Sequence, residues 1–108
     1  MAKVKKSRTK SDAMRFLEGL MGGPLTFGAM LASIRATDEY TLAAMATKLG
    51  VTRAVICDVE KGRRGVSADR AAKWAKALGY PPPLFVKLAL QAQVDEAGLE
   101  LVVDVKAA

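Results

Sequence analysis

The amino-acid sequence predicts an all-α domain of five helices, preceded by an extra helix and followed by a short β-strand. Apolar residues recur three and four positions apart from residue 27 to about residue 97, and capping residues stand where such helices would begin and end. After Gly98 the apolar period changes from helical to two. A chain of 108 residues has room for one domain with a modest core.

The first 23 residues are expected to hold an arm and one helix. Residues 1–11 are polar and cationic with almost nothing to bury, so we interpret them as a disordered basic arm. Either Ser11 or Asp12 can cap a helix over residues 12–23, which ends at the Gly-Gly-Pro sequence of residues 22–24.

Four of the five main helices are expected to begin at a hydroxyl residue, whose oxygen can accept a bond from a backbone N–H of the first turn. These N-caps are Thr26, Thr41, Thr52 and Ser67. The second, third and fourth helices end at glycines, which tolerate the left-handed conformation: Gly50, Gly62 and Gly79. The stripes expected to face the core are Phe27, Met30, Leu31 and Ile34; Leu42, Met45, Ala46 and Leu49; Ile56 and Val59; and Ala71, Trp74, Ala75 and Leu78.

The fifth helix is expected from Leu84 to about Ala97, after three prolines. Its apolar residues cover more than one face, so we expect it to pack against two surfaces. Beyond it, alternating apolar residues predict the strand: Leu99, Leu101, Val103 and Val105. Because one strand cannot satisfy its own backbone, we expect it to pair with the same strand of a second copy.

Composition excludes several classes of site. One cysteine excludes an intrachain disulfide, and the lack of histidine excludes the commonest zinc sites. No nucleophile, base and orienting group can be assembled, so we expect no enzyme activity, no metal and no cofactor. Cys57 is expected to be a small packing residue rather than a redox switch. No apolar run could span a membrane and no apolar signal core follows the basic N-terminus, so we expect a cytoplasmic protein.

The charge of the chain favours a polyanionic partner. Its formal net charge is +6 and its isoelectric point is near 9.7. The basic residues are clustered in the arm and in the middle of the chain, whereas acidic residues mark the C-terminal part. The middle cluster is Arg53, Lys61, Arg63 and Arg64.

The second and third helices fit the helix-turn-helix arrangement, because they are short and joined by residues 49–52, and a Gly-Arg-Arg loop follows the third. Such a third helix projects its N-terminal residues into a DNA major groove, and the loop lies along a phosphate strand. Successive residues of a helix are rotated by about 100° around its axis. If Ile56 and Val59 are buried, the residues that face outward are Arg53, Ala54, Asp58 and Lys61.

Residues 41–79, TLAAMATKLGVTRAVICDVEKGRRGVSADRAAKWAKALG, resemble the Xre/Cro/C1 family of five-helix, lambda-repressor-like helix-turn-helix domains. The likeness covers residues 25 to about 90. It rests on the Ala-x-x-Leu-Gly-Val-Thr turn, the Glu-x-Gly-Arg-Arg exit and the Leu-Gly after a fourth helix. Within that family the chain is similar to HigA-like antitoxins and phage-type repressors.

The resemblance implies a role for each matching position. The positions that face DNA bases are Thr52, Arg53, Ala54 and Asp58. Those that contact phosphate are Thr41, through its backbone, and Lys61, Arg63 and Arg64. Arg35 and Glu60 match a pair that ties the first helix to the third as a partly buried ion pair.

Arg53 is the expected base reader, since its guanidinium can fork onto O6 and N7 of guanine. Asp58 accepts a bond from cytosine N4, selects against phosphate proximity, or is an exposed helix residue near Lys61. Leu42 stands where the family usually has glutamine, and the third helix lacks the amides that pair with adenine. We therefore expect few direct base contacts, with specificity that depends on Arg53, dimer spacing and DNA shape.

These observations predict a repressor that binds a palindromic operator on double-stranded DNA as a homodimer. The alternative is an antitoxin of a type II system that neutralises a partner toxin and autoregulates its operon. Either would act in a bacterial or phage context, at the nucleoid. The expected dimerisation residues are Leu84, Phe85, Leu88, Leu99, Leu101, Val103 and Val105.

The chain is accordingly divided into four parts. Residues 1–11 are the arm, which either enters a minor groove or acts as a solubilising tail. Residues 12–23 are the N-terminal helix. Residues 24–80 are the helix-turn-helix DNA-binding domain, and residues 81–108 are the C-terminal helix and strand, which form the dimerisation element.

Overall fold

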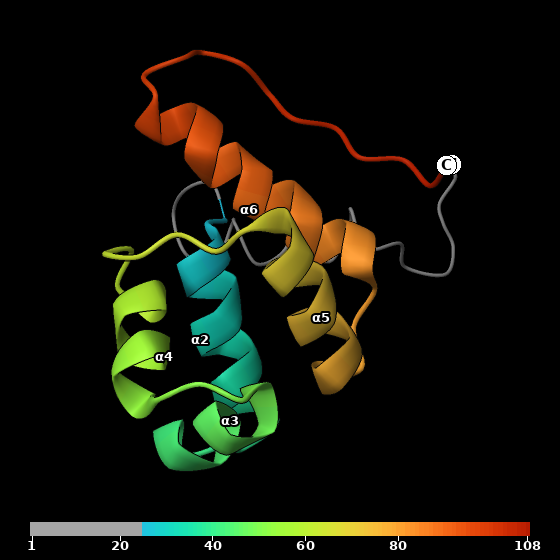
Figure 1. The fold of residues 1–108 in the computed structure, drawn as a ribbon. Coiled ribbons are helices and arrows are strands. Elements are labelled where there is room, and N and C mark those ends of the chain that lie inside the picture. Colours follow the sequence, from blue (N-terminus) through green and yellow to red (C-terminus); the bar gives the residue numbers. More distant parts are fainter. Residues whose placement is uncertain (1–24) are drawn as a thin grey trace.

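The computed structural model describes residues 25–108, and this part of the chain is all-α. Its helices are α2 (Phe27–Thr37), α3 (Leu42–Leu49), α4 (Arg53–Glu60), α5 (Ala68–Leu78) and α6 (Pro82–Glu96). Figure 1 shows α2 between α4 on one side and α5 on the other, with α3 and α6 at opposite ends. The predicted all-α class and the five main helices are confirmed, whereas the helix predicted over residues 12–23 lies outside the described residues.

The predicted N-caps are confirmed at all four positions. Each hydroxyl oxygen accepts a bond from the backbone N–H three residues later, at 3.1 Å for Thr26, 3.0 Å for Thr41, 3.3 Å for Thr52 and 3.2 Å for Ser67. Helix α6 begins at Pro82, two residues before the predicted start. Proline suits this position because the N–H it lacks would have no partner in the first turn of a helix.

The core draws on all five described helices, and three aromatic rings pack together where α2, α5 and α6 meet. The ring of Phe27 packs edge-on against Phe85, with centroids 5.7 Å apart, and tilted against Trp74 at 6.2 Å. Phe85 is fully buried and Trp74 is 3% exposed. Trp74 therefore belongs to the core, as its place in an apolar stripe predicts, and α6 shares one core with α2.

Helices α2 and α4 cross very closely at Gly28. A Cβ atom built on this residue would overlap the carbonyl oxygen of Val59 and would lie 2.8 Å from the carbonyl oxygen of Glu60. Both obstacles are backbone atoms, which cannot move aside by a change of rotamer. The missing side chain at position 28 therefore sets how closely α4 packs against α2.

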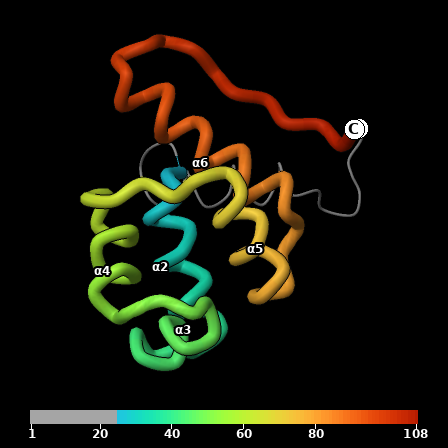
Figure 2. Tube along the Cα trace, in the orientation of Figure 1, coloured from blue at the N-terminus to red at the C-terminus, as the bar shows by residue number. Residues whose placement is uncertain are grey.

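The predicted C-terminal strand is not supported, because residues 99–108 form no strand within the described chain. Figure 2 shows the chain turning back after α6 and running alongside it. The side chain of Gln91 holds this tail, because its amide N–H donates to the carbonyl oxygen of Leu101 at 2.8 Å and its amide oxygen accepts from the N–H of Val103 at 2.7 Å. An amide side chain offers the same donor and acceptor as a neighbouring strand, but for only one pair of residues. The alternation of apolar and polar residues thus occurs in an extended segment that belongs to no sheet.

None of the helices within residues 25–108 has the length and apolar character needed to cross a membrane.

Candidate nucleic-acid interface

The turn between α3 and α4 has the geometry of a helix-turn-helix. Gly50 ends α3 in the left-handed conformation, with φ of 71°, and Thr52 caps α4 two residues later. The N–H of Val51 donates to the carbonyl oxygen of Ala46 at 2.9 Å, which fixes the path of the turn. Below it, Met45 of α3 and Ile56 of α4 are fully buried, so the two helices hold a fixed relative position.

The outer surface of α4 carries the residues expected to face DNA bases. Thr52, Arg53 and Ala54 are exposed at its N-terminal end, whereas Val55 and Cys57 are half-buried on its flanks. The backbone therefore presents the first turn of α4 outward. The guanidinium of Arg53 has no hydrogen bond or ion pair with any of residues 25–108, so its donors are available to a ligand.

The chain folds back over α4 immediately after the helix ends. Gly62 adopts a left-handed conformation with φ of 78°, and the N–H of Arg63 donates to the carbonyl oxygen of Asp58 at 2.8 Å. The N–H of Gly62 donates to the carbonyl oxygen of Val59 at 3.1 Å. These two bonds make a Schellman motif, which places Arg63 beside the last turns of α4 rather than beyond them.

Asp58 and Arg63, predicted to have separate roles, form an ion pair. Nε and Nη2 of Arg63 both donate to Oδ1 of Asp58, at 3.1 Å and 2.9 Å. The side chain of Arg63 is 58% exposed and that of Asp58 is 35% exposed. The hydrogen bond to the carboxylate raises the pKa of Arg63 above its ordinary value. None of the interpretations of Asp58 from the sequence included this partner. The available signal was Gly62 after the helix, which turns the chain so that the next residue lies beside α4.

The other residues expected to contact phosphate are spread over two elements. Lys61 and Arg64 are exposed in the loop after α4, and neither pairs with a residue in the described part of the chain. Thr41 is exposed at the N-terminus of α3. Its hydroxyl caps the helix, which leaves the other free N–H groups of the first turn facing solvent.

Arg35 of α2 and Glu60 of α4 form the pair that the family resemblance implied. Nε of Arg35 lies 2.7 Å from Oε2 of Glu60, and Nη2 lies 3.1 Å from Oε1. A third donor, Nη1, reaches the carbonyl oxygen of Tyr40 at 3.4 Å. The bond to Glu60 is the main reason that the pKa of Arg35 is raised. The two-point geometry ties the end of α4 to α2 and to the segment before α3.

The residues expected at a dimer interface are divided between core and surface. Phe85 and Leu88 are 0% and 5% exposed, so the fold of a single chain already buries them. Leu99 and Leu101 are 52% and 59% exposed in the tail, and Leu84, Val103 and Val105 are half-buried. Val102, which the sequence analysis did not select, is 88% exposed. Among residues 25–108, the exposed large apolar side chains are therefore in the tail.

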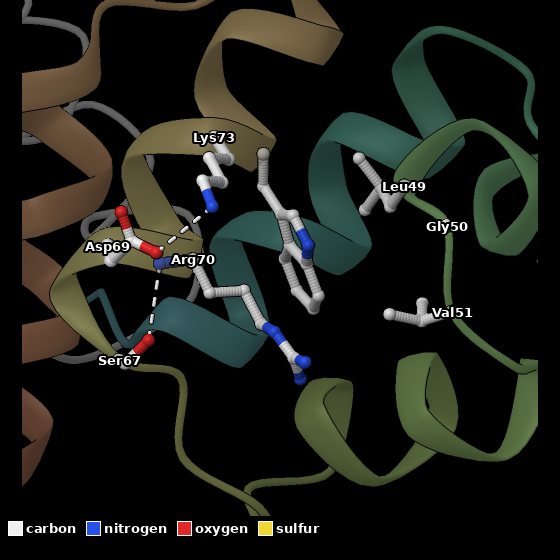
Figure 3. A pocket seen from close by; sticks show the side chains of 8 residues that line it. Leu49, Gly50, Val51, Ser67, Asp69, Arg70 and Lys73 are labelled. Carbon is white, nitrogen blue, oxygen red and sulfur yellow. Dashed lines mark hydrogen bonds and ion pairs between the residues drawn. The ribbon is translucent and has the colours of Figure 1, made fainter.

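A hollow of about 470 Å³ lies between the turn and the start of α5. Figure 3 shows Leu49, Gly50 and Val51 on one side of it, and α5 with Arg70 and Lys73 on the other. Lys73 pairs with Asp69 at 3.2 Å, and both side chains are largely exposed. Among residues 25–108, no group of three or more potential metal ligands occurs there or elsewhere.

Comparison with known proteins locates a similarity on this part of the chain. A family model described as Helix-turn-helix matches residues 31–85. The match begins within α2, contains α3, α4 and α5, and ends in the first turn of α6. A comparison with curated proteins gave no match. The matched region thus contains the turn and α4, and it leaves out the tail.

Proposed function

Since this chain belongs to the Xre/Cro/C1-type helix-turn-helix family, whose domains bind DNA in transcription regulation, we propose that it is a repressor that binds a palindromic operator as a dimer. The observation that carries the proposal is the exposed N-terminal end of α4, which directly follows the tight connection from α3. The proposal is also supported by the exposed cationic side chains of Lys61, Arg63 and Arg64 in the loop after α4.

Base recognition in this proposal depends on the N-terminal end of α4. Arg53 is exposed and free of partners within residues 25–108, so its fork can bind the O6 and N7 atoms of a guanine. Ala54 and the methyl group of Thr52 offer apolar contact to a thymine methyl. With so few groups able to contact bases, DNA shape contributes a large share of the specificity.

Phosphate binding is assigned to the first turn of α3 and to the loop after α4. The free backbone N–H groups that follow Thr41 bind one phosphate. Lys61, Arg63 and Arg64 bind others along the same groove, and each releases condensed counterions. Affinity should therefore fall steeply as salt rises.

The test measures binding of the full chain to DNA. Selection from a random duplex library at stated salt gives the operator, and fluorescence anisotropy then gives affinities. The double variant Arg53→Ala/Arg63→Ala should lose specific binding, whereas Lys76→Ala, which removes an exposed cation on α5, should not. If the double variant binds the operator as tightly as the wild type, the proposal is wrong.

The dimer is supported by the apolar surface of the tail. Leu99, Leu101 and Val102 are exposed on a segment that the described part of the chain leaves uncovered on its outer side. In the proposed dimer a second copy covers this surface, and we expect the two α4 helices to bind half-sites about 34–36 Å apart. Analytical ultracentrifugation of the wild type should show a dimer, and Leu101→Asp/Val102→Asp should shift it to monomer.

The second candidate function is that of an antitoxin, and the same apolar surface favours it. A tail that is fixed to α6 yet exposes apolar side chains could lie along a toxin as well as along a second copy. Sequencing of the neighbouring gene separates the candidates. A small basic ribonuclease-like protein encoded there favours the antitoxin, and its absence counts against it.

A further inference from the structure

The pair formed by Asp58 and Arg63 lies on the side of α4 that the proposed function turns toward DNA. Its acidic member is unexpected there, because a carboxylate close to phosphates repels them. A base-reading role for Asp58 is weakened by the geometry, since its Oδ1 already accepts two bonds from Arg63. The position therefore needs another explanation.

Arg63 is fixed at both ends. Its backbone N–H donates to the carbonyl oxygen of Asp58 at 2.8 Å through the Schellman motif, and its side chain donates to the carboxylate of the same residue. Neither Lys61 nor Arg64, its exposed neighbours in the loop, has a side-chain hydrogen bond or ion pair with any of residues 25–108. Among the cations of this loop, Arg63 is thus the one held in a defined orientation.

The bonds to Asp58 leave Nη1 of the guanidinium without a partner among residues 25–108. An arginine carries five N–H donors; Nε and Nη2 donate to the carboxylate, and Nη2 also lies 4.0 Å from Sγ of Cys57. The hydrogens of Nη1 can donate to a phosphate oxygen. Because the side chain is 58% exposed, these donors are open to solvent.

We propose that Asp58 is a positioning residue, which holds the guanidinium of Arg63 ready to bind one DNA phosphate, and that it does not read a base. The inference rests on the proposed function and deepens it. Fixing a long side chain before binding removes part of the entropy that binding would otherwise cost. The carboxylate thus favours DNA binding although its charge alone opposes it.

The test compares Asp58→Ala, Arg63→Ala and the double variant on the operator and on an unrelated duplex of equal length, over a range of salt concentrations. Each single variant should lose roughly tenfold in affinity on both duplexes, the effect of about one charge-assisted hydrogen bond. The slope of log affinity against log salt should become shallower by about 0.9, or one phosphate, in each single variant. The double variant should show no further loss.

Two further variants keep the test independent of folding and of net charge. Asp69→Ala removes an exposed carboxylate from a pair on α5 and should leave affinity and slope unchanged. Asp58→Asn keeps an oxygen that can accept from Nε of Arg63 and should restore part of the loss. Circular dichroism of each variant checks that the helices are intact.

The inference is overturned if Asp58→Ala binds as tightly as the wild type or more tightly, the result expected from charge repulsion alone. It is also overturned if the loss is confined to the operator and disappears when one base pair is changed, which would make Asp58 a base reader. Failure of the wild type to bind any DNA would instead refute the proposed function.

Discussion

Substitution of Gly28 by alanine tests the close crossing of α2 and α4. In an open helix this change would stabilise the protein by about 0.8–1.0 kcal/mol, because alanine has the higher helix propensity. Here the new methyl group would overlap the carbonyl oxygen of Val59 and would lie 2.8 Å from that of Glu60. The two effects therefore have opposite signs.

The steric effect should be the larger of the two. Overpacking of a well-packed site costs about 1–3 kcal/mol when side chains can adjust, and here the obstacles are backbone atoms, so the upper end of this range applies. Subtraction of the gain in propensity leaves a destabilisation of about 2 kcal/mol. The variant must also move α4 away from α2, which strains the bonds between Arg35 and Glu60.

Urea unfolding measures this difference directly. Trp74, the single tryptophan, is 3% exposed, so its fluorescence reports the exposure of the core. Gly65→Ala is the matched control, because a Cβ atom at that position meets nothing within 4 Å and its backbone is not left-handed. The control should be neutral or slightly stabilising. Equal stability of Gly28→Ala and the wild type would refute the packing argument.

Three further changes test other contacts. Arg35→Ala leaves the carboxylate of Glu60, which is 11% exposed, without its partner, and should lower the free energy of unfolding by roughly 1–3 kcal/mol in urea; no loss would mean that the pair contributes nothing. Thr52→Ala removes the cap of α4 and should cost about 1 kcal/mol in thermal unfolding, whereas Thr52→Ser should keep most of it. Burial raises the pKa of Tyr80 above its ordinary value of 10.0, so its contribution is complete below that pH and is lost as pH rises through the folded-state pKa. The fall in stability above about pH 10 should be smaller in Tyr80→Phe, and an identical fall would contradict this assignment.

Features of the fold that depend on local backbone chemistry were predictable from the sequence. A hydroxyl before each of four apolar stripes and a left-handed glycine after α3 and α5 are local signals, and the structure places the ends of those helices there. Burial of Trp74 followed from its place in a regular stripe. These predictions succeed because each rests on residues within one or two helical turns of one another.

Features that depend on what the rest of the chain provides were not predictable in the same way. The alternation after Gly98 is the pattern of a strand, but no second strand pairs with it in the described chain, and the side chain of Gln91 bonds to the tail instead. The sequence of α6 does not reveal which of its apolar residues the core of the same chain covers. The prediction that Phe85 and Leu88 contact a second copy therefore missed their burial in the core. The pair of Asp58 and Arg63 joins a helix to the loop beyond it, outside any helical period.

Because Gln91 holds the tail, the direction of the tail depends on which side of α6 the side chain of Gln91 projects from. Insertion of one residue between Leu88 and Gln91 would rotate the amide by about 100° around the axis of α6 and carry the tail to another side of the molecule, while the residues before the insertion kept their register. In a dimer joined through the tail, this rotation would change the angle between the two DNA-binding halves. A short stretch of α6 would then determine which spacings of half-sites the protein accepts, without touching DNA.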